Sequence, residues 1–287
     1  GYYSTTDRYV LRKHAEMLAD AGVDVIFFDC TNGAHLWSSS YWTLLETFAE
    51  ARKQGVKTPQ IAFMLNFGPM PSTTIMLERL YEELYKDGHY KDLWFYWEGK
   101  PLIMAYPEGL NPLLENHSEI LEFFTFRRNE ASYFTRAYGL GYWGWLSIYP
   151  QGKFGVDEDG NIEQMTVGVA QNATKDYLTA MNGKNVLGRS YASGNYYYTY
   201  TYRNRKIKVD KNIENSKLYG LNFQQQWDYA IENDPKFIFV TGWNEWVALR
   251  FSTWQRVENA FPDQFNDEYS RDIEPSKGDL KDHYYYQ

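Results

Sequence analysis

The sequence predicts an α/β protein, a (β/α)8 TIM barrel whose first strand precedes residue 1. Apolar runs of strand type alternate with amphipathic helical stretches, a pattern typical of a parallel sheet covered on both faces. We count seven such strands, one short of a barrel, and the chain opens in a loop that leads straight into a helix. A seven-stranded sheet or an open doubly wound sheet is the alternative.

Each element follows from periodicity and from stop signals. Residues 9–21 carry apolar side chains at helical spacing, and Gly22 follows as a stop. The run 23–29 is a buried strand, rich in β-branched and aromatic residues. Further strands are expected over 60–67, 100–107, 122–128, 142–150, 164–171 and 236–243, and further helices over 41–55, 72–88, from near Ala173 and over 221–234.

A polar, Tyr-rich insertion over 183–220 interrupts this alternation. Its strand-like tyrosine run suggests a hairpin, and it lies on a loop that follows a strand. Because loops after strands build the active-site face of a barrel, we expect the insertion on that face. No repeat, low-complexity linker or Pro-rich hinge divides the chain, so residues 1–287 are predicted to form one catalytic domain, incomplete at its N-terminus.

The composition narrows the classes of molecule that this protein could bind. The net charge of -8 argues against a nucleic acid, and no apolar stretch approaches the about 20 residues that a membrane helix needs. Aromatic residues make up 18% of the chain, and flat rings stack on sugars as well as on bases. The net negative charge of the chain favours sugars over nucleic acids as its ligand. The start of the chain has no signal-peptide pattern, which does not settle its location.

The cysteine and histidine content of the sequence gives little support for metal or redox chemistry. Cys30 is the one cysteine, so an internal disulfide and a multi-cysteine metal site are excluded, and the five histidines show no metal-ligand spacing. We expect no metal and no organic cofactor, and we expect a monomer.

Polar or aromatic side chains recur at or near the ends of the predicted strands, where a barrel concentrates its catalytic groups. They are Asp29, Asn32, Asn66, Arg127, Trp143, Asn244 and Glu245. Asp29 has a structural alternative as a loop cap or as the ion-pair partner of Arg127, and Trp143 has one as a core residue.

Glu245 is the strongest catalytic candidate. It follows an apolar strand and lies between Trp243 and Trp246. A carboxylate is costly to bury without a partner, and burial against aromatic rings raises a carboxyl pKa, which suits a general acid.

The motifs "WNEW" (243–246) and "IEP" (273–275), together with "ADAGVDVIFFDCTNG" and "FNDEYSRDIEP", resemble those of a glycoside hydrolase clan, the endo-α-mannosidases and α-1,3-glucanases of families 71 and 99. The resemblance covers most of the chain. It implies an eight-stranded barrel and a glycosidase with two carboxylates near the last strand. The family's second glutamate, three residues after the first, is replaced here by Ala248, so Glu268 or Asp29 is expected to supply the second carboxylate.

The resemblance implies a glycosidase that acts on an α-linked glycan or polysaccharide and lies in the periplasm or outside a bacterial cell. Hydrogen bonds to sugar hydroxyls are expected from Asn32, Asn66, Arg127 and Asn244, and ring stacking from Trp97, Trp143, Trp243 and Trp246. A carbohydrate-binding barrel that has lost catalysis is the main alternative. A less favoured one is an oligonucleotide-binding barrel that uses the Tyr-rich basic loop.

Overall fold

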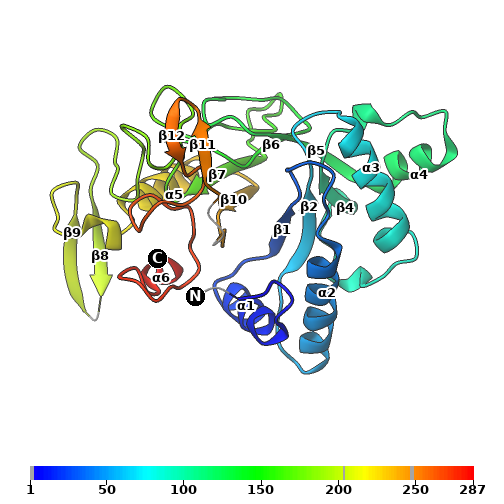
Figure 1. Ribbon diagram of the computed structural model, residues 1–287, viewed down its shortest axis with the longest axis horizontal. Helices are drawn as coiled ribbons and strands as arrows, with labels where there is room; N and C mark the ends of the chain where they lie inside the picture. Colours follow the sequence, from blue (N-terminus) through cyan, green and yellow to red (C-terminus); the bar gives the residue numbers. More distant parts are fainter. Residues whose placement is uncertain (1–2, 203, 246–248) are drawn as a thin grey trace. The chain divides into compact units, whose positions relative to one another are not determined.

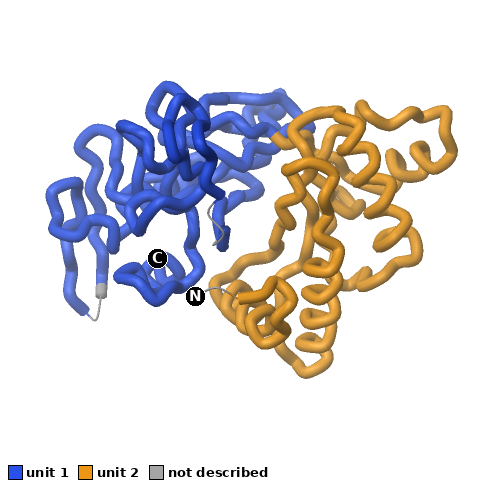
Figure 2. The backbone as a smooth tube through the Cα atoms, viewed as in Figure 1, with its two compact units in different colours: residues 1, 130–287 blue, residues 2–129 orange. Residues whose placement is uncertain are grey.

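The computed structural model describes residues 3–202, 204–245 and 249–287. The chain divides into two compact units (Figure 2). The N-terminal unit ends at Asn129, and the C-terminal unit runs from Glu130 to Gln287. Each is an α/β assembly with parallel strands.

The N-terminal unit alternates strands and helices. Its strands are β1 (Val25–Asp29), β2 (Gln60–Met64), β3 (Tyr96–Trp97), β4 (Lys100–Met104) and β5 (Thr125–Glu130). Its helical segments are α1 (Arg8–Asp20), α2 (Ser38–Lys53), α3 (Pro71–Leu80), η1 (Tyr81–Tyr85), η2 (Lys91–Leu93), η3 (Pro107–Gly109) and α4 (Glu115–Phe123). Strands β1, β2, β4 and β5 are parallel neighbours in that order, and β3 pairs antiparallel with β4 (Figure 1).

Helix α1 begins and ends where the sequence predicts. The side chain of Asp7 accepts hydrogen bonds from the backbone amides of Tyr9 and Val10, which stabilises the first turn. After the helix, Gly22 adopts a φ of +80°, a conformation that a glycine reaches at little cost.

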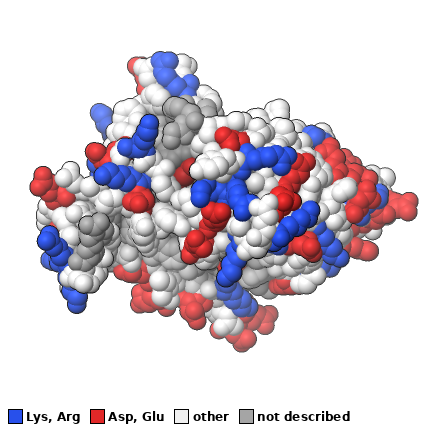
Figure 3. Space-filling view, turned by 90° about the horizontal axis from the view of Figure 1, so that it is seen from below, with Lys and Arg blue, Asp and Glu red and all other residues white. Residues whose placement is uncertain are grey.

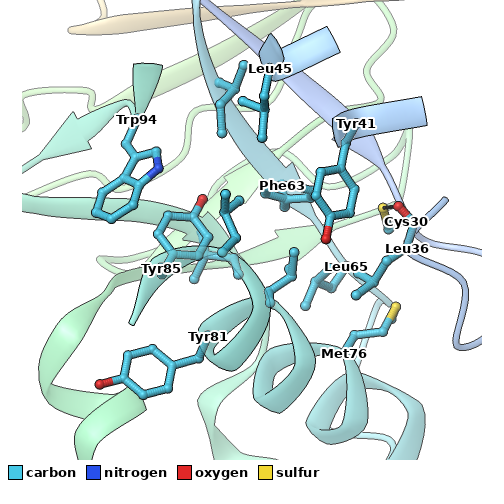
Figure 4. Packing of buried hydrophobic residues seen from close by; sticks show 14 of the residues in the cluster. Cys30, Leu36, Tyr41, Leu45, Phe63, Leu65, Met76, Tyr81, Tyr85 and Trp94 are labelled. Carbon is cyan, nitrogen blue, oxygen red and sulfur yellow. Dashed lines mark hydrogen bonds between the residues drawn. The ribbon is translucent and has the colours of Figure 1, made fainter. Parts of the chain in front are cut away.

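Aromatic rings pack among leucine and isoleucine side chains in the core of the N-terminal unit (Figure 4). The ring of Phe63 on β2 packs edge-on against Tyr41 of α2 at 5.3 Å, and Tyr85 lies 4.7 Å from the ring of Trp94. The buried thiol of Cys30 lies beside them, and burial raises its pKa to about 12. Cys30 is therefore a core residue in its neutral form at ordinary pH.

The C-terminal unit has a parallel pair of strands and two hairpins. Its strands are β6 (Tyr142–Gly144), β7 (Gln164–Gly168), β8 (Tyr198–Tyr202), β9 (Arg205–Val209), β10 (Phe237–Thr241), β11 (Phe251–Trp254) and β12 (Val257–Ala260). Its helices are η4 (Ser216–Leu218), α5 (Leu221–Asn233) and α6 (His283–Tyr286). Strand β10 is parallel to β7, while β8–β9 and β11–β12 are antiparallel hairpins.

All seven predicted strands are present, and the alternation of helices with parallel strands is confirmed. The Tyr-rich insertion contains the hairpin β8–β9. Closure into an eight-stranded barrel, a first strand upstream of residue 1 and a single catalytic domain stay predictions.

The helix expected from near Ala173 is wrong. Ala173 forms an isolated bridge with Leu178, and the hydroxyl of Thr174 accepts hydrogen bonds from the amides of Asp176 and Tyr177. This side-chain turn satisfies the amides that would otherwise start a helix.

Charged side chains of both signs lie interspersed on the face in Figure 3. Within the described ranges 3–202, 204–245 and 249–287, no helix has both the length and the apolar character needed to cross a bilayer.

Candidate functional site

The segment after β10 is held against residues 271–274 by its backbone. Gly242 has a φ of +97°, and a Cβ at this position would collide with the carbonyl oxygen of Arg271. The carbonyl of Trp243 accepts hydrogen bonds from the amides of Ile273 and Glu274. Only a glycine adopts this φ and also allows so close a contact. Gly242 therefore fixes the position of the backbone that leads to Glu245.

Glu245 lies at the end of this segment and is not buried. Its side chain is 44% exposed, and Oε2 accepts a hydrogen bond from Nη2 of Arg271 at 3.2 Å. The expectation of a carboxylate buried between two tryptophans is therefore wrong for Glu245. Trp246, the second of those tryptophans, lies outside the described residues, as does Ala248. Asn244, the residue before Glu245, is exposed and donates to Glu274 Oε2 at 3.0 Å.

Arg271 is a buried cation shared by two carboxylates. Its Nη2 donates to Asp263 as well as to Glu245, and its guanidinium lies 5.9 Å from the ring of Trp145. Burial alone would lower the pKa of Arg271, but Tyr133, Asp263 and Glu245 together raise it above its usual value. The guanidinium therefore stays charged at any ordinary pH.

The pairing brings Glu245 and Asp263 close together. Both accept from the same nitrogen, so their nearest oxygens lie within two hydrogen-bond lengths, about 6 Å at most. Asp263 is 13% exposed, against 44% for Glu245. The site thus contains two carboxylates in unlike surroundings.

Asp272 supports the backbone of Glu245. Its Oδ1 accepts a hydrogen bond from the Glu245 amide, and its Oδ2 accepts one from Ser270 Oγ at 2.9 Å. The carbonyl of Asp272 accepts from Nη2 of the buried Arg189. Burial raises the pKa of Asp272, although these donors and the two arginines act in the opposite direction.

The raised pKa of Asp272 predicts a pH dependence of stability. Native Asp272 holds its proton to a higher pH than the unfolded chain does, so its contribution is complete below the unfolded value of about 3.9 and is lost as pH rises through the native pKa. We expect the free energy of unfolding of the wild type, relative to that of Asp272→Asn, to fall as pH rises over this window. Urea unfolding at a series of pH values measures it, and a relative free energy that rises with pH would contradict the assignment.

Glu268, one of the expected second carboxylates, fastens the Tyr-rich insertion. Its Oε1 accepts from the amide of Ser190 at 2.9 Å and its Oε2 from the hydroxyl of the same residue at 2.7 Å. A Cβ on Gly188 would collide with this carboxylate. Both oxygens of Glu268 are thus engaged in holding the start of the insertion, and its catalytic role stays a prediction.

The expectation that Trp143 stacks on a sugar is wrong. Its side chain is fully buried, its Nε1 donates to Glu163 at 2.8 Å, and its ring stacks on Phe237 at 4.6 Å. Trp143 therefore belongs to the core. Trp243 is half-buried and meets Tyr285 edge-on at 6.4 Å.

Two expected sugar-binding residues of the N-terminal unit are also buried. Asn66 donates to the carbonyls of Thr31 and Gly33, and its Oδ1 accepts from Ser72. Its amide thus has protein partners for both donors and for its acceptor, so it orders the loop after β1, and its role in binding sugar stays a prediction. Arg127 is also buried and forms a 3.0 Å ion pair with Glu98.

The other three expected residues of this unit are accessible. Asp29 is exposed, and its Oδ1 accepts from the amide of Thr31 at 2.9 Å, as a loop cap does. Asn32 is exposed and Trp97 is half-buried. Their roles stay predictions.

Sequence reasoning missed Arg271, Asp263 and Asp272. The first and last belong to "SRDIEP", a segment used above only as a family signature. The signal that could have identified them is the adjacent Arg-Asp pair. It directly precedes Ile273 and Glu274, whose amides donate to the carbonyl of Trp243 after the last strand. Among described residues, no group of three or more His, Cys, Asp or Glu side chains is arranged to hold a metal ion.

Comparison with solved structures identifies the fold. The chain matches a GH99 endo-α-mannosidase from Bacteroides thetaiotaomicron, in complex with bis-tris-propane, with a TM-score of 0.53 and 16% identity, over 99% of this chain and 83% of that one. A second structure of the enzyme from that organism gives a TM-score of 0.45 and 17% identity, over 93% and 78% of the two chains. No protein-family model matches the chain, and the search of curated proteins finds no match. The chain therefore shares its fold with a GH99 endo-α-mannosidase over nearly its whole length.

Proposed function

We propose that this protein is a glycoside hydrolase that cleaves an α-linked glycan or polysaccharide. The observation that carries the proposal is the carboxylate pair of Glu245 and Asp263 on one arginine nitrogen, in a chain with the fold of a GH99 glycosidase. Paired carboxylates are what glycoside hydrolysis requires.

The two carboxylates take different parts in the proposed reaction. The ion pair with Arg271 stabilises Glu245 as an anion, and its exposure leaves it accessible to a substrate. Glu245 then attacks the anomeric carbon, or accepts the proton of the sugar's own attacking 2-hydroxyl, and the glycosidic bond breaks as the second carboxyl group gives its proton to the leaving oxygen. In a second step that carboxylate takes a proton from water, which attacks the anomeric carbon and releases the sugar. Asp263, the more enclosed of the two, is the second carboxylate, in place of Glu268 or Asp29. Asn244 and Trp243 are the neighbouring sugar-binding residues, and Asn32 and Trp97 are retained as predicted ones.

The spacing of the pair predicts the stereochemistry. Carboxyl groups about 5–5.5 Å apart accompany retention of the anomeric configuration, and separations of about 6.5–9.5 Å accompany inversion. Because the nearest oxygens of the pair lie within about 6 Å of each other, we predict the shorter spacing and therefore retention.

Two observations favour the alternative, a carbohydrate-binding protein without catalysis. Arg271 engages Glu245, and the sequence has Ala248 where the family has its second glutamate. In this alternative the ion pair is structural, and the surface around Glu245 binds sugar without cleaving it.

A hydrolysis screen separates the two functions. The purified chain is incubated with yeast α-mannan, α-1,3-glucan and α-linked oligosaccharides, and NMR follows the anomeric signals of the first products. Release of α-anomers supports a retaining glycosidase, and β-anomers rule out the proposed geometry. Saturable binding without turnover of any glycan supports the alternative. The periplasmic or extracellular location remains a proposal, which cell fractionation tests.

A further inference from the structure

The hairpin β8–β9 buries one face against its own unit. Tyr198 lies opposite Val209, and Tyr200 lies opposite Ile207, so these four side chains share a face. Val209 is fully buried, and the hydroxyl of Tyr198 donates to the carbonyl of Tyr219. The tyrosine face therefore packs against the rest of the unit and supports the hairpin.

The opposite face is exposed and basic. Thr199 lies opposite Lys208, and Thr201 lies opposite Lys206, and all four are exposed. Hydroxyl and ammonium groups thus lie side by side across the two strands. We call these four residues the threonine–lysine face.

The charge around this face is unlike that of the whole chain. Residues 205–211 contain four basic side chains and one acidic one, whereas the chain has 29 Lys and Arg against 37 Asp and Glu. Lys208 pairs with Asp210 at 3.4 Å, and neither Arg205 nor Lys206 forms an ion pair with a described residue. Basic side chains lie at the left end of Figure 3, where the hairpin lies in Figure 1. A concentration of exposed cations in an acidic protein fits an anionic ligand.

The described tyrosines nearby do not form a row of open rings, because Tyr197 is exposed whereas Tyr196, Tyr198 and Tyr200 are partly buried. Tyr198 and Tyr200 belong to the opposite face, and the ring of Tyr197 has the ammonium of Lys208 at 4.6 Å from its centre. Single-stranded nucleic acids are bound through open aromatic platforms. A membrane surface would require apolar side chains on this face, where threonines and lysines lie instead.

We propose that the threonine–lysine face binds an anionic polysaccharide. Carboxylate or sulfate groups of the glycan pair with Lys206 and Lys208, and its hydroxyls hydrogen-bond with Thr199 and Thr201. The inference rests on the proposed function in that the bound glycan belongs to the class of molecule that the protein would cleave, and it narrows that class to acidic glycans.

Dextran sulfate and dextran test the proposal because they share an α-linked glucan backbone and differ in charge. Fluorescein-labelled samples of equal length are titrated with the full chain, and anisotropy is recorded from about 50 to about 200 mM salt. We expect binding of dextran sulfate and not of dextran. Lys206→Gln/Lys208→Gln should weaken binding at least about tenfold at the lower salt and reduce the slope of log K against log salt by about 1 to 2.

Two further double variants serve as controls. Lys206→Arg/Lys208→Arg keeps both charges and should keep the affinity. Lys53→Gln/Lys57→Gln removes two exposed lysines of the N-terminal unit and should leave binding unchanged.

Three results would overturn the proposal. They are equal binding of dextran and dextran sulfate, an equal loss in the Lys53/Lys57 variant, and tighter binding of oligothymidylate that depends on Lys206 and Lys208. Since the readout is binding, a chain that binds dextran sulfate through this face and hydrolyses no glycan contradicts the proposed function alone.

Discussion

Replacement of Glu245 by glutamine is expected to lower glycan hydrolysis roughly 10²- to 10⁴-fold and to leave the fold intact. The amide is isosteric with the carboxylate and still accepts a hydrogen bond from Arg271, but it neither accepts a proton nor attacks a sugar. With 44% of the side chain exposed, little packing is disturbed. Initial rates of reducing-end release on the substrate found by the glycan screen measure the effect.

Matched variants locate the second carboxylate. Glu232→Gln, an exposed position on α5, should retain wild-type activity. Asp263→Asn should lose activity comparably to Glu245→Gln, while Glu268→Gln should lose less. If Glu268→Gln is as inactive as Glu245→Gln and Asp263→Asn is active, the second carboxylate is Glu268. Undiminished hydrolysis by Glu245→Gln removes the catalytic assignment altogether.

Replacement of Arg271 by methionine is expected to destabilise the protein by about 3–5 kcal/mol. Methionine fills part of the space of the arginine stem, but it leaves Asp263 largely enclosed without its counter-charge. Guanidinium chloride unfolding, followed by tryptophan fluorescence, measures the change, because the ring of Trp145 lies next to the guanidinium.

The double variant Arg271→Met/Asp263→Asn isolates the electrostatic part of this loss in the free energy of unfolding. It removes the unpaired charge as well as the cation, so it should regain part of the stability lost in the single variant. Arg250→Met, at an exposed arginine of the same unit, should change stability by less than about 0.5 kcal/mol. A loss of under about 1 kcal/mol in Arg271→Met would show that the ion pair contributes little to the fold.

Strands such as β2 and β7 were predictable because each coincides with a largely apolar run. Strand β7 consists of five buried residues, and β2 buries four of its five. The hairpin β11–β12 could not be predicted in this way. Its turn residues Gln255 and Arg256 both have positive φ, where a sequence normally has asparagine or glycine. Short exposed strands joined by such a turn carry neither a periodic nor a turn signal.

The candidate site was predictable in part. The position of Glu245 after the last strand follows from the apolar run that precedes it. Its environment does not, because the partner of a half-exposed carboxylate is set by tertiary contacts about 25 residues away, at Arg271 and Asp272. The burial of Asn66, Arg127 and Trp143 was not predictable for a related reason. A polar or aromatic residue near a strand end can be satisfied inside the protein, and nothing in its local sequence distinguishes that case.

Because Gly242 contacts the backbone of Arg271, the residues between them form a loop whose two ends meet. This loop can change in length at its exposed hairpin β11–β12 without altering the contacts of Asp263 and Glu268 that hold it. Divergent homologues should therefore be recognised by two short anchors, a Gly-Trp-Asn-Glu and an Arg-Asp, separated by a gap of variable length. An alignment that penalises this gap would separate proteins that share this backbone frame.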